Sequence, residues 1–291
     1  MNLTLDEKKI RKGRAVGLPY VGSKKKVSKN IVEIIKQNFG ADKTVYDVFG
    51  GGGAITAELM INGIDVVYND LDKTITDMFN RVLSQDREWI KTLIVSRDEF
   101  LTIRSKENKT VDDELKLLVN SFGNNRKDYL YAKDISDIKY NLAVDIIKKD
   151  NVFSGYKQTE TYKSFLKNNH EQLEQLEQLE RLQQLASLQQ LERLPKTINK
   201  DYKYFSNVKN SILYLDPPYE NTETGPYKSQ IDYQEFYDWA YEMSKNNVVL
   251  LSSYEVSGDG FECVYEFKNA RSSFSGGMTG KRTEKLFMVK L

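Results

Sequence analysis

Residues 211–219 read Ser-Ile-Leu-Tyr-Leu-Asp-Pro-Pro-Tyr, and this stretch decides the fold. The apolar, β-prone run 212–215 predicts a buried strand. The strand has to stop at Asp216, because the two prolines that follow cannot donate to a sheet ladder. Polar and aromatic groups therefore lie on a stiff turn at the carboxyl end of a strand. In open α/β sheets, ligands bind at that edge.

The turn 216–219 carries groups that suit a planar amine. The Asp216 carboxylate and the Pro217 carbonyl can accept hydrogen bonds from an exocyclic amine, and Pro218 keeps the turn stiff. The Tyr219 ring offers a face for a base, and such stacking is worth about 1–3 kcal/mol. An ordinary turn at the end of a strand would use the same residues, since Asp-Pro and Pro-Pro are common turn pairs. The rest of the chain has to decide between the two interpretations.

The composition excludes several classes of protein. With 43 Lys and Arg against 42 Asp and Glu, the net charge of +1 does not indicate nucleic-acid binding, so that role would need local basic patches. The single cysteine, Cys263, and the single histidine, His170, exclude a disulfide framework and a metal site built on them. No stretch approaches the roughly 18 apolar residues of a membrane span, and no secretory signal begins the chain. We expect a cytoplasmic α/β protein without metal or membrane contact.

A second strand, expected at 44–49, leads into four glycines at 50–53 and an apolar helix at 54–60. Strand, glycine-rich turn and helix together let a backbone approach a nucleotide-like ligand closely. The glycines depart from the G-x-G-x-x-G pattern, so the loop alone is weak evidence. We expect further elements as strands at 65–68, 248–253 and 285–291, the last at the edge of the sheet, and as helices at 24–40, 75–82 and 233–244.

The third strand ends in Asn69 and Asp70, about twenty residues after the strand that precedes the glycines. An acidic side chain at this place can bind ribose hydroxyls. The same two residues could instead cap the helix that follows, and both roles are compatible.

The stretch 84–199 differs in character and predicts an insert. Its segment 120–127 combines amides with adjacent cations, the groups that groove reading and phosphate contact require, although a solvated helical insert would look similar. A basic, glycine-bearing loop near the C-terminus also suits phosphate contact, or is a plain solvated loop. The candidate DNA-contacting residues are Asn120, Asn124, Asn125, Arg126, Lys127, Arg271 and Arg282.

Leucine occurs at every third position of 173–194, with Glu, Gln and Arg between. These fillers are strong helix formers, and Pro195 ends the predicted helix. Three residues turn a helix by about 300°, so the leucine stripe spirals and is no heptad. We interpret it as a low-complexity helical spacer, roughly 30 Å long. A dimerisation or partner-binding helix is the alternative.

In their order along the chain, these motifs resemble the Dam-like D12 class of adenine-specific DNA methyltransferases. The resemblance covers most of the chain outside the leucine repeat. It is carried by Pro19-Tyr20-Val21-Gly22-Ser23-Lys24, Asp47-Val48-Phe49-Gly50-Gly51-Gly52-Gly53, Asn69-Asp70, the segment from Asn120 to Arg126, Asp216-Pro217-Pro218-Tyr219 and Arg282-Thr283-Glu284-Lys285-Leu286.

The resemblance implies a Rossmann-like methyltransferase sheet with a mostly helical DNA-recognition insert, S-adenosyl-L-methionine as methyl donor and N6 of adenine in double-stranded DNA as substrate. It implies a catalytic domain of 1–83 and 200–291 around an insert of 84–199. Lys24 would hold the methionine carboxylate, Asp70 the ribose, and Asp201 with Tyr202 the cofactor adenine. The implied cofactor-binding set is Tyr20, Lys24, Asp47, Phe49, Gly51, Gly53, Asp70, Asp201, Tyr202 and Asp216. The implied catalytic set is Asp216, Pro217, Pro218 and Tyr219.

Chemical reasoning agrees with that assignment. An amine inside a duplex cannot be reached, so the base has to be flipped into a pocket. Hydrogen bonds to Asp216 and Pro217 would free the N6 lone pair for in-line attack on a methyl group. Carbon methylation of cytosine would need a reactive cysteine, and Cys263 has no such setting. We expect Asp216→Ala to abolish methylation and Tyr219→Phe to be nearly silent.

Alternatives remain open on the sequence alone. A cytosine-N4 methyltransferase would use the same amine-binding logic, and an RNA or protein methyltransferase is a further option. From another class, the chain could be a non-catalytic protein that binds DNA or a partner on the same fold, through the leucine repeat. The same repeat could form a homo-oligomer.

Overall fold

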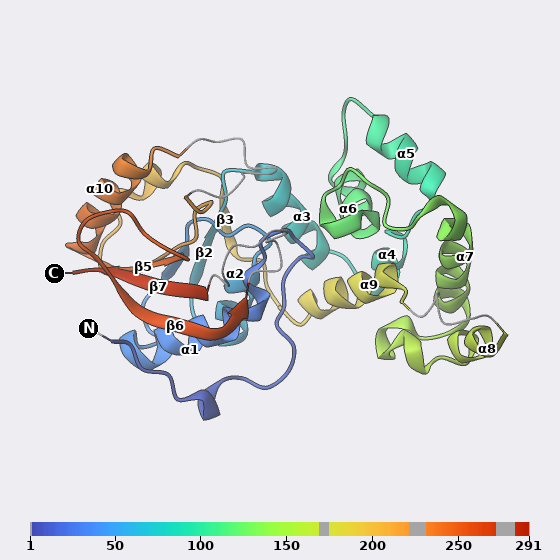
Figure 1. Ribbon diagram of the computed structural model, residues 1–291, viewed down its shortest axis with the longest axis horizontal. Helices are drawn as coiled ribbons and strands as arrows, with labels where there is room; N and C mark the ends of the chain where they lie inside the picture. The colour runs from blue at the N-terminus through green and yellow to red at the C-terminus, as the bar shows by residue number, and fades with distance from the viewer. Residues whose placement is uncertain (1, 169–174, 221–230, 272–282, 291) are drawn as a thin grey trace. The chain divides into compact units, whose positions relative to one another are not determined.

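The structure is a computed structural model of the 291-residue chain, and it describes residues 2–168, 175–220, 231–271 and 283–290 (Figure 1). The chain divides into two compact units. The first comprises 1–15, 24–73 and 195–291, and the second comprises 16–23 and 74–194.

The first unit is built on a seven-stranded sheet in the order β3-β2-β1-β4-β5-β7-β6. Strands β1 to β5 run parallel, whereas β7 is antiparallel to both of its neighbours. The order reverses between β1 and β4, and such a switch point opens a ligand crevice at the carboxyl ends of the strands. This arrangement confirms the expected α/β, Rossmann-like class. The strands are β1 Val45–Asp47, β2 Val66–Asn69, β3 Lys196–Ile198, β4 Ile212–Leu215, β5 Val248–Ser253, β6 Phe261–Arg271 and β7 Thr283–Val289.

The end of the sheet differs from the expectation. We expected the last strand, 285–291, at the edge, but β7 lies inside the sheet between β5 and β6. Its adjacent residues Leu286 and Phe287 are both buried, as an interior strand covered on both faces requires. The true edge strand, β6, and the short strand β3 were not predicted.

Helices cover both faces of this sheet, because the strands carry apolar residues on both sides. On one face Ile212 and Tyr214 of β4 pack with the helices α1 (Ser28–Phe39) and α2 (Ala54–Ile61). On the other, Leu213 and Leu215 pack with α10 (Tyr233–Ser244) and the 3-10 helix η7 (Tyr202–Phe205). Two further 3-10 helices, η1 (Glu7–Lys9) and η2 (Lys24–Lys26), precede α1. Figure 1 shows strands of this sheet between α10 and α1.

The second unit is helical, as the expected insert is. Among the residues of this unit that the structure describes, Ser121 and Tyr129 form the one isolated strand-like bridge. No helix in the described ranges is long and apolar enough to cross a membrane. The elements are α3 Lys73–Leu83, α4 Arg87–Lys91, α5 Arg97–Ser105, α6 Val111–Asn120, η3 Phe122–Asn124, α7 Lys133–Lys149, η4 Val152–Ser154, η5 Tyr156–Gln158, α8 Glu160–Asn168 and α9 Glu177–Leu188.

The spacer interpretation of the leucine repeat is wrong. The helix in this region, α9, has 12 residues, and it packs against α4, α6 and η4 inside the second unit. Its leucines at 179, 182, 185 and 188 are fully buried, as is Leu176 just before it. Steps of about 300° spread five such leucines round most of the helix, which is the pattern of a central helix. The leucines of α9 are therefore core and offer no surface to a partner. Residues 173 and 174 lie outside the described residues.

Candidate active site

The site forms where β1 and β4 lie side by side. Parallel pairing sets Asp47, the last residue of β1, opposite Tyr214 of β4. Side chains alternate along a strand, and Tyr214 faces α1 and α2, so Asp216 two residues on faces the same way. Asp47 and Asp216 therefore share one side of the sheet at its switch point.

The glycine loop between β1 and α2 is tied to the end of β2. The Gly51 amide donates to Asp70 Oδ2 at 2.8 Å, and the Tyr68 hydroxyl donates to the Gly51 carbonyl at 2.6 Å. A Cβ on Gly50 would lie 2.4 Å from the Tyr68 ring, so only glycine fits there. Gly51 and Gly53 adopt φ angles of 47° and 70°, in the left-handed region that glycine tolerates. The loop is thus held close to Asp70 without covering side chains.

The Asp70 carboxylate orders the backbone around it, whether or not it also binds a ligand. Its second oxygen, Oδ1, accepts from the Asp72 amide at 2.9 Å, so the carboxylate joins the glycine loop to the start of the next segment. Burial raises the pKa of Asp70. The ribose-binding role stays a prediction.

Asp47 organises the start of α2. Its Oδ2 accepts from the Thr56 hydroxyl at 2.7 Å and from the Thr56 amide at 3.1 Å. Its other oxygen is buried and has no hydrogen-bond partner among the described residues. Burial, together with the charges of Asp216 and Asp70, raises the pKa of Asp47 to about 7. One acceptor of this carboxylate is thus unused.

The segment after β3 adds the predicted adenine-binding residues to the same edge. The Lys200 amide donates to Asn69 Oδ1 at 2.9 Å, which fixes the segment to the end of β2. Asp201 caps η7 by accepting from the amide two residues on, at 3.0 Å. Tyr202 is buried, and its ring centroid lies 6.2 Å from that of the half-buried Phe49. Phe49 is the more accessible of the two rings.

A charged cluster of Lys24, Asp216 and Glu284 closes this edge. The ammonium Nζ of Lys24 lies 2.7 Å from Asp216 Oδ1 and 3.4 Å from Glu284 Oε1. Lys24 also donates to the Tyr219 hydroxyl at 2.6 Å, and Tyr219 in turn donates to Glu284. Glu284 accepts a further bond from Ser252 Oγ at 2.6 Å. The three charged side chains are only 12, 15 and 10% exposed.

Two carboxylates in this cluster share one ammonium. Burial opposes the charge on Lys24, but Asp216 and Glu284 outweigh it and raise the pKa of Lys24. Burial and the charge of Glu284 raise the pKa of Asp216 to about 6, although Lys24 acts in the opposite direction. No group of acidic, His or Cys side chains in the described ranges could hold a metal ion. With two carboxylates and one ammonium, the cluster carries an excess of negative charge.

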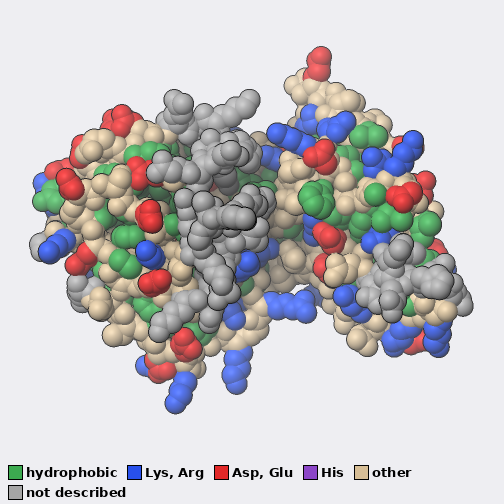
Figure 2. Space-filling model, viewed as in Figure 1, with side chains coloured by type: hydrophobic (Ala, Val, Ile, Leu, Met, Phe, Trp, Pro, Cys, Tyr) green, Lys and Arg blue, Asp and Glu red, His purple; other side chains and the backbone are tan. Residues whose placement is uncertain are grey.

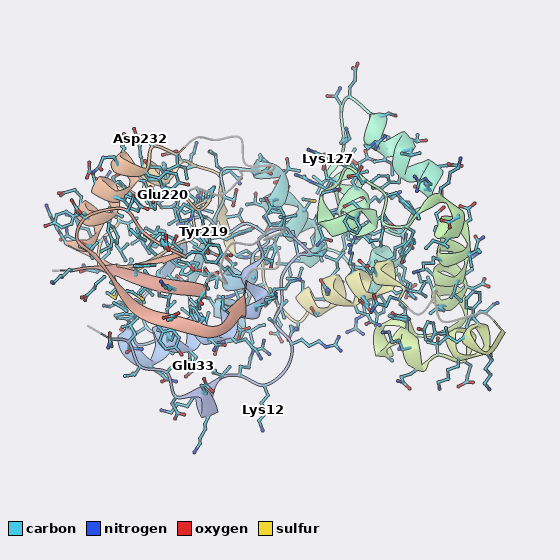
Figure 3. The ribbon with its side chains drawn as sticks, viewed as in Figure 1. Lys12, Glu33, Lys127, Tyr219, Glu220 and Asp232 are labelled. Atoms are coloured by element: carbon cyan, nitrogen blue, oxygen red, sulfur yellow. The ribbon has the colours of Figure 1, made fainter. Side chains whose placement is uncertain are left out.

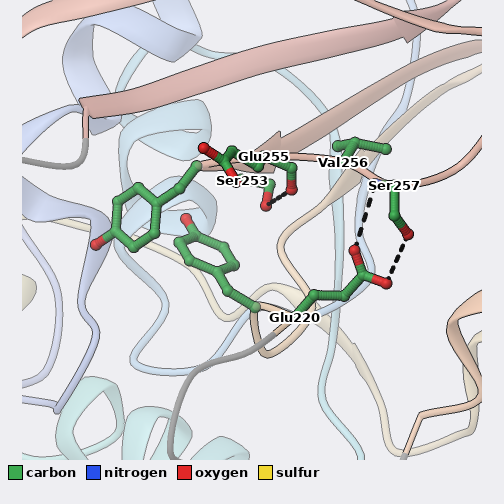
Figure 4. A pocket seen from close by; sticks show the side chains of 7 residues that line it. Glu220, Ser253, Glu255, Val256 and Ser257 are labelled. Atoms are coloured by element: carbon green, nitrogen blue, oxygen red, sulfur yellow. Dashed lines mark hydrogen bonds between the residues drawn. The ribbon is translucent and has the colours of Figure 1, made fainter. Parts of the chain in front are cut away.

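A cavity of about 140 Å³ lies beside the turn that carries Tyr219 (Figure 4). The rings of Tyr219 and Tyr254 meet edge to face, with centroids 4.6 Å apart. Across the cavity, Glu220 accepts from Ser257 Oγ at 2.8 Å, and Figure 3 shows Glu220 next to Tyr219. The Tyr233 hydroxyl of α10 donates to the Pro218 carbonyl. The Asp-Pro-Pro-Tyr turn is thus fastened from both sides, next to an aromatic wall.

One predicted DNA contact is wrong. Asn120 is fully buried in the second unit. Its Nδ2 donates to the Leu93 and Lys116 carbonyls at 2.8 and 2.7 Å, and its Oδ1 accepts from the Val95 amide. The amide was read as a surface group, whereas it bonds backbone inside the core.

The other predicted contacts of the second unit lie on the loop 121–128. Lys127 is exposed (Figure 3), and so is Phe122, at 65%, which the sequence analysis did not single out. Arg126 pairs with Glu114 at 3.1 Å, and the Asn125 side chain accepts from the two amides that follow Arg126. Asn124 adopts a φ of 59°, as a turn residue does. Arg126 and Asn125 therefore shape the loop.

The contacts described above do not include three of the predicted site residues, Tyr20, Arg271 and Arg282. Tyr20 is half-buried and belongs to the second unit. Arg271 ends β6, without a described side chain, and Arg282 lies outside the described residues. On the face drawn in Figure 2, basic and acidic side chains are interspersed.

Four site residues were missed as site residues: Glu284, Ser252, Tyr254 and Tyr233. Only Glu284 carried a signal, because it lies in the C-terminal segment that resembles the family. Ser252 lies on β5, Tyr254 in the loop after β5, and Tyr233 on α10. The fold brings these three residues to the segment that follows β4.

The sequence matches the D12 class N6 adenine-specific DNA methyltransferase family over residues 20–274. No match to a curated protein was found. Among solved structures, a crystal structure of a candidate methylase from Haemophilus influenzae is similar, with 9% identity and a TM-score of 0.35, over 91% of this chain and 96% of that one. The strand order of the sheet is what assigns the fold class.

Proposed function

The chain belongs to the D12 class of N6 adenine-specific DNA methyltransferases, and we propose that it moves the methyl group of S-adenosyl-L-methionine to N6 of a flipped adenine at Asp216. One observation carries this proposal. A buried carboxylate stands at the carboxyl end of β4, beside the glycine loop of β1, at the point where the strand order reverses.

The residues at the edge of the sheet fit the cofactor. The positive-φ glycines leave backbone open to a close approach, and Asp70 is fixed beside them, where it can accept from ribose hydroxyls. Phe49 offers a partly accessible ring, whereas the ammonium of Lys24 is already paired with Asp216 and Glu284, so its predicted contact with the methionine carboxylate stays a prediction. The cofactor would supply an electrophilic methyl group on a positively charged sulfur. The excess negative charge of the Lys24, Asp216 and Glu284 cluster favours such a cation.

The target amine would be held by Asp216, the Pro217 carbonyl and the Tyr219 ring. Asp216 Oδ1 is now paired with the Lys24 ammonium at 2.7 Å, which shows that a nitrogen donor fits against this carboxylate, as an incoming amine would. Ionised above about pH 6, it would orient N6 and then accept the proton that N6 loses, while the N–C bond would form as the sulfur–methyl bond breaks and the neutral thioether leaves. The wall of Tyr219 and Tyr254 would pack on the flipped base, which has to leave the duplex to be reached.

The loop 121–128 would contact DNA. Lys127 suits a phosphate, and the exposed ring of Phe122 can pack on a base. Acting on double-stranded DNA, the enzyme would work in the cytoplasm.

The test is radiolabelled methyl transfer from S-adenosyl-L-methionine to unmethylated duplex DNA, followed by nucleoside analysis. N6-methyladenine would support the proposal, and loss of that product in Asp216→Ala would assign it to this site. N4-methylcytosine would indicate the other amine. If neither product forms and titration detects no cofactor binding, the chain is a binding protein.

A further inference from the structure

Lys24 occupies the place that the proposed function gives to the target amine. Its nitrogen lies 2.7 Å from Asp216 Oδ1 and 4.7 Å from the centroid of the Tyr219 ring. A flipped adenine whose N6 bonds the same oxygen, Oδ1, beside the Tyr219 ring would place that nitrogen where the ammonium now lies. The two nitrogens cannot share one place, so Lys24 has to leave Asp216 before the base can bind.

The departing ammonium needs another partner. Lys24 is buried, and a buried charge that loses its counter-ion is strongly unfavourable. Glu284 meets this need, because its Oε1 is already 3.4 Å from Lys24 Nζ. A shift of less than about 1 Å would bring the two to the usual distance of a charge-assisted hydrogen bond.

Glu284 is also held firmly enough to receive the ammonium. It lies on β7, inside the sheet, and its side chain is 10% exposed. Ser252 Oγ on the paired strand β5 donates to it at 2.6 Å, and the Tyr219 hydroxyl donates to the same oxygen. The carboxylate is therefore fixed at one distance from the Lys24 side chain.

We propose that Lys24 is a placeholder on Asp216, and that Glu284 is the second partner to which its ammonium moves when the target amine arrives. Glu284 is then a positioning residue that acts through Lys24, and the inference rests on the proposed function. Without Glu284, entry of the base would leave Lys24 with the neutral Tyr219 hydroxyl but with no carboxylate partner among the described residues, so Lys24 would keep Asp216 occupied.

The test is a double-mutant cycle of Lys24→Met and Glu284→Gln, read by two measurements. The first is kcat and KM for duplex DNA. The second is the fluorescence of 2-aminopurine placed next to the methylated adenine mapped in the transfer assay, which rises when that adenine leaves the stack and enters the site with its N6 intact. The matched control is Glu266→Gln, the same chemical change at an exposed position of the neighbouring strand β6.

Glu284→Gln should lower base entry and kcat/KM by about tenfold, and in the Lys24→Met background it should change base entry less than about threefold. Lys24→Met alone should raise the 2-aminopurine signal, because it vacates Asp216. Glu266→Gln should match the wild type. Equal effects of Glu284→Gln in both backgrounds would overturn the inference, as would an unchanged signal in Lys24→Met.

Ser252→Ala covers the case in which Glu284→Gln does not fold, as judged by its thermal melt. It loosens Glu284 without removing a charge, and it should reduce base entry only while Lys24 is present. If the wild-type enzyme transfers methyl groups but the effects of Lys24→Met and Glu284→Gln are additive, only this inference is overturned. A wild-type protein that transfers none overturns the proposed function and the inference with it.

Discussion

The two units bury polar side chains in different ways. In the first unit, Lys24, Asp216 and Glu284 are bonded mostly to one another, and one acceptor oxygen of Asp47 has no hydrogen bond from the described residues. In the second unit, the buried cation of α9, Arg181, donates to backbone carbonyls. Side chains paired with side chains can exchange partners when a ligand arrives, whereas bonds to backbone fix a shape. The first unit is therefore built for exchange and the second for rigidity.

Arg181 shows how the rigid unit works. Its Nη1 donates to the Val119 and Ser121 carbonyls at 2.8 and 2.6 Å, at the end of α6, where helix carbonyls lack partners. One turn away, the Gln178 amide donates to Asn120 and to the Val95 carbonyl. The helix α9 thus fixes the start of the loop 121–128 through the hydrogen bonds of Arg181 and Gln178. The spacing of the leucines does not predict these bonds.

The largest effect should come from removing the Asp216 carboxylate, at which Lys24 and the target amine are proposed to exchange. Asp216→Ala takes away the acceptor proposed for N6, and losing one such catalytic contact typically costs about 10²–10³ in rate. We expect methyl transfer in the radiolabel assay to fall by at least that factor. Thermal melting should show a folded protein, since Lys24 retains Glu284 as a partner. Turnover near that of the wild type would contradict the role of Asp216.

The rigid unit should respond in stability. Arg181→Met leaves carbonyls at the end of α6 without a donor inside the core, at a cost of about 2–4 kcal/mol. Urea unfolding measures the loss, and Lys203→Ala, which breaks an exposed pair with Glu235, is the control with an expected change below about 0.5 kcal/mol. Affinity for S-adenosyl-L-methionine, measured by titration, should not change. A stable Arg181→Met variant would show that the carbonyl bonds do not hold the unit.

Asp47 links the exchange site to stability through pH. Its pKa of about 7 in the folded state lies above the ordinary value of roughly 3.9, so between these pH values the folded protein keeps a proton that the unfolded chain has lost. Stability should therefore fall as pH rises from about 4 to about 7, and stay level above. Asp47→Asn removes this dependence and should gain about 4 kcal/mol over the wild type at pH 8, with little gain at pH 4. Urea unfolding at the two pH values measures it, and an equal gain at both would contradict the assignment.

The sequence predicted what is local. Strand 212–215, its two prolines and Asp216 follow one another, so the position of the carboxylate at a strand end could be read directly. The partners of Asp216 could not, because Lys24 and Glu284 lie near opposite ends of the chain: Lys24 begins η2, whereas Glu284 is brought to this edge by the pairing of β7 with β5.

Two errors have a common cause. Asn120 was assigned to the surface because it is polar, and the leucine repeat was assigned to a spacer because it has no heptad. Both belong to one packed core, in which α9 is surrounded on several sides and polar side chains bond to backbone. Burial of that kind depends on several helices at once and has no signature in a single segment.

The structure also changes the expectation for Tyr219→Phe, which the sequence alone predicted to be nearly silent. The hydroxyl accepts from Lys24 and donates to Glu284, so the change leaves both with one bond fewer. We expect kcat/KM to fall by about tenfold, the equivalent of one such hydrogen bond. Tyr219→Ala, which also removes the ring, should be worse. Full activity of Tyr219→Phe in the transfer assay would restore the view that only the ring matters.

The smallest effect should come from the exposed loop of the rigid unit. Lys127 is exposed, and its proposed contact is with a phosphate, so Lys127→Ala should weaken binding equally for all DNA sequences. The slope of log affinity against log salt should fall by about 1, as for one lost phosphate contact. Lys163→Ala, on the exposed surface of α8, is the matched control and should leave the slope unchanged. Because the loop is held by Arg181 and not by Lys127, melting should be the same in both variants, and any loss of stability in Lys127→Ala would mean that the loop is less rigid than the bonds beneath it indicate.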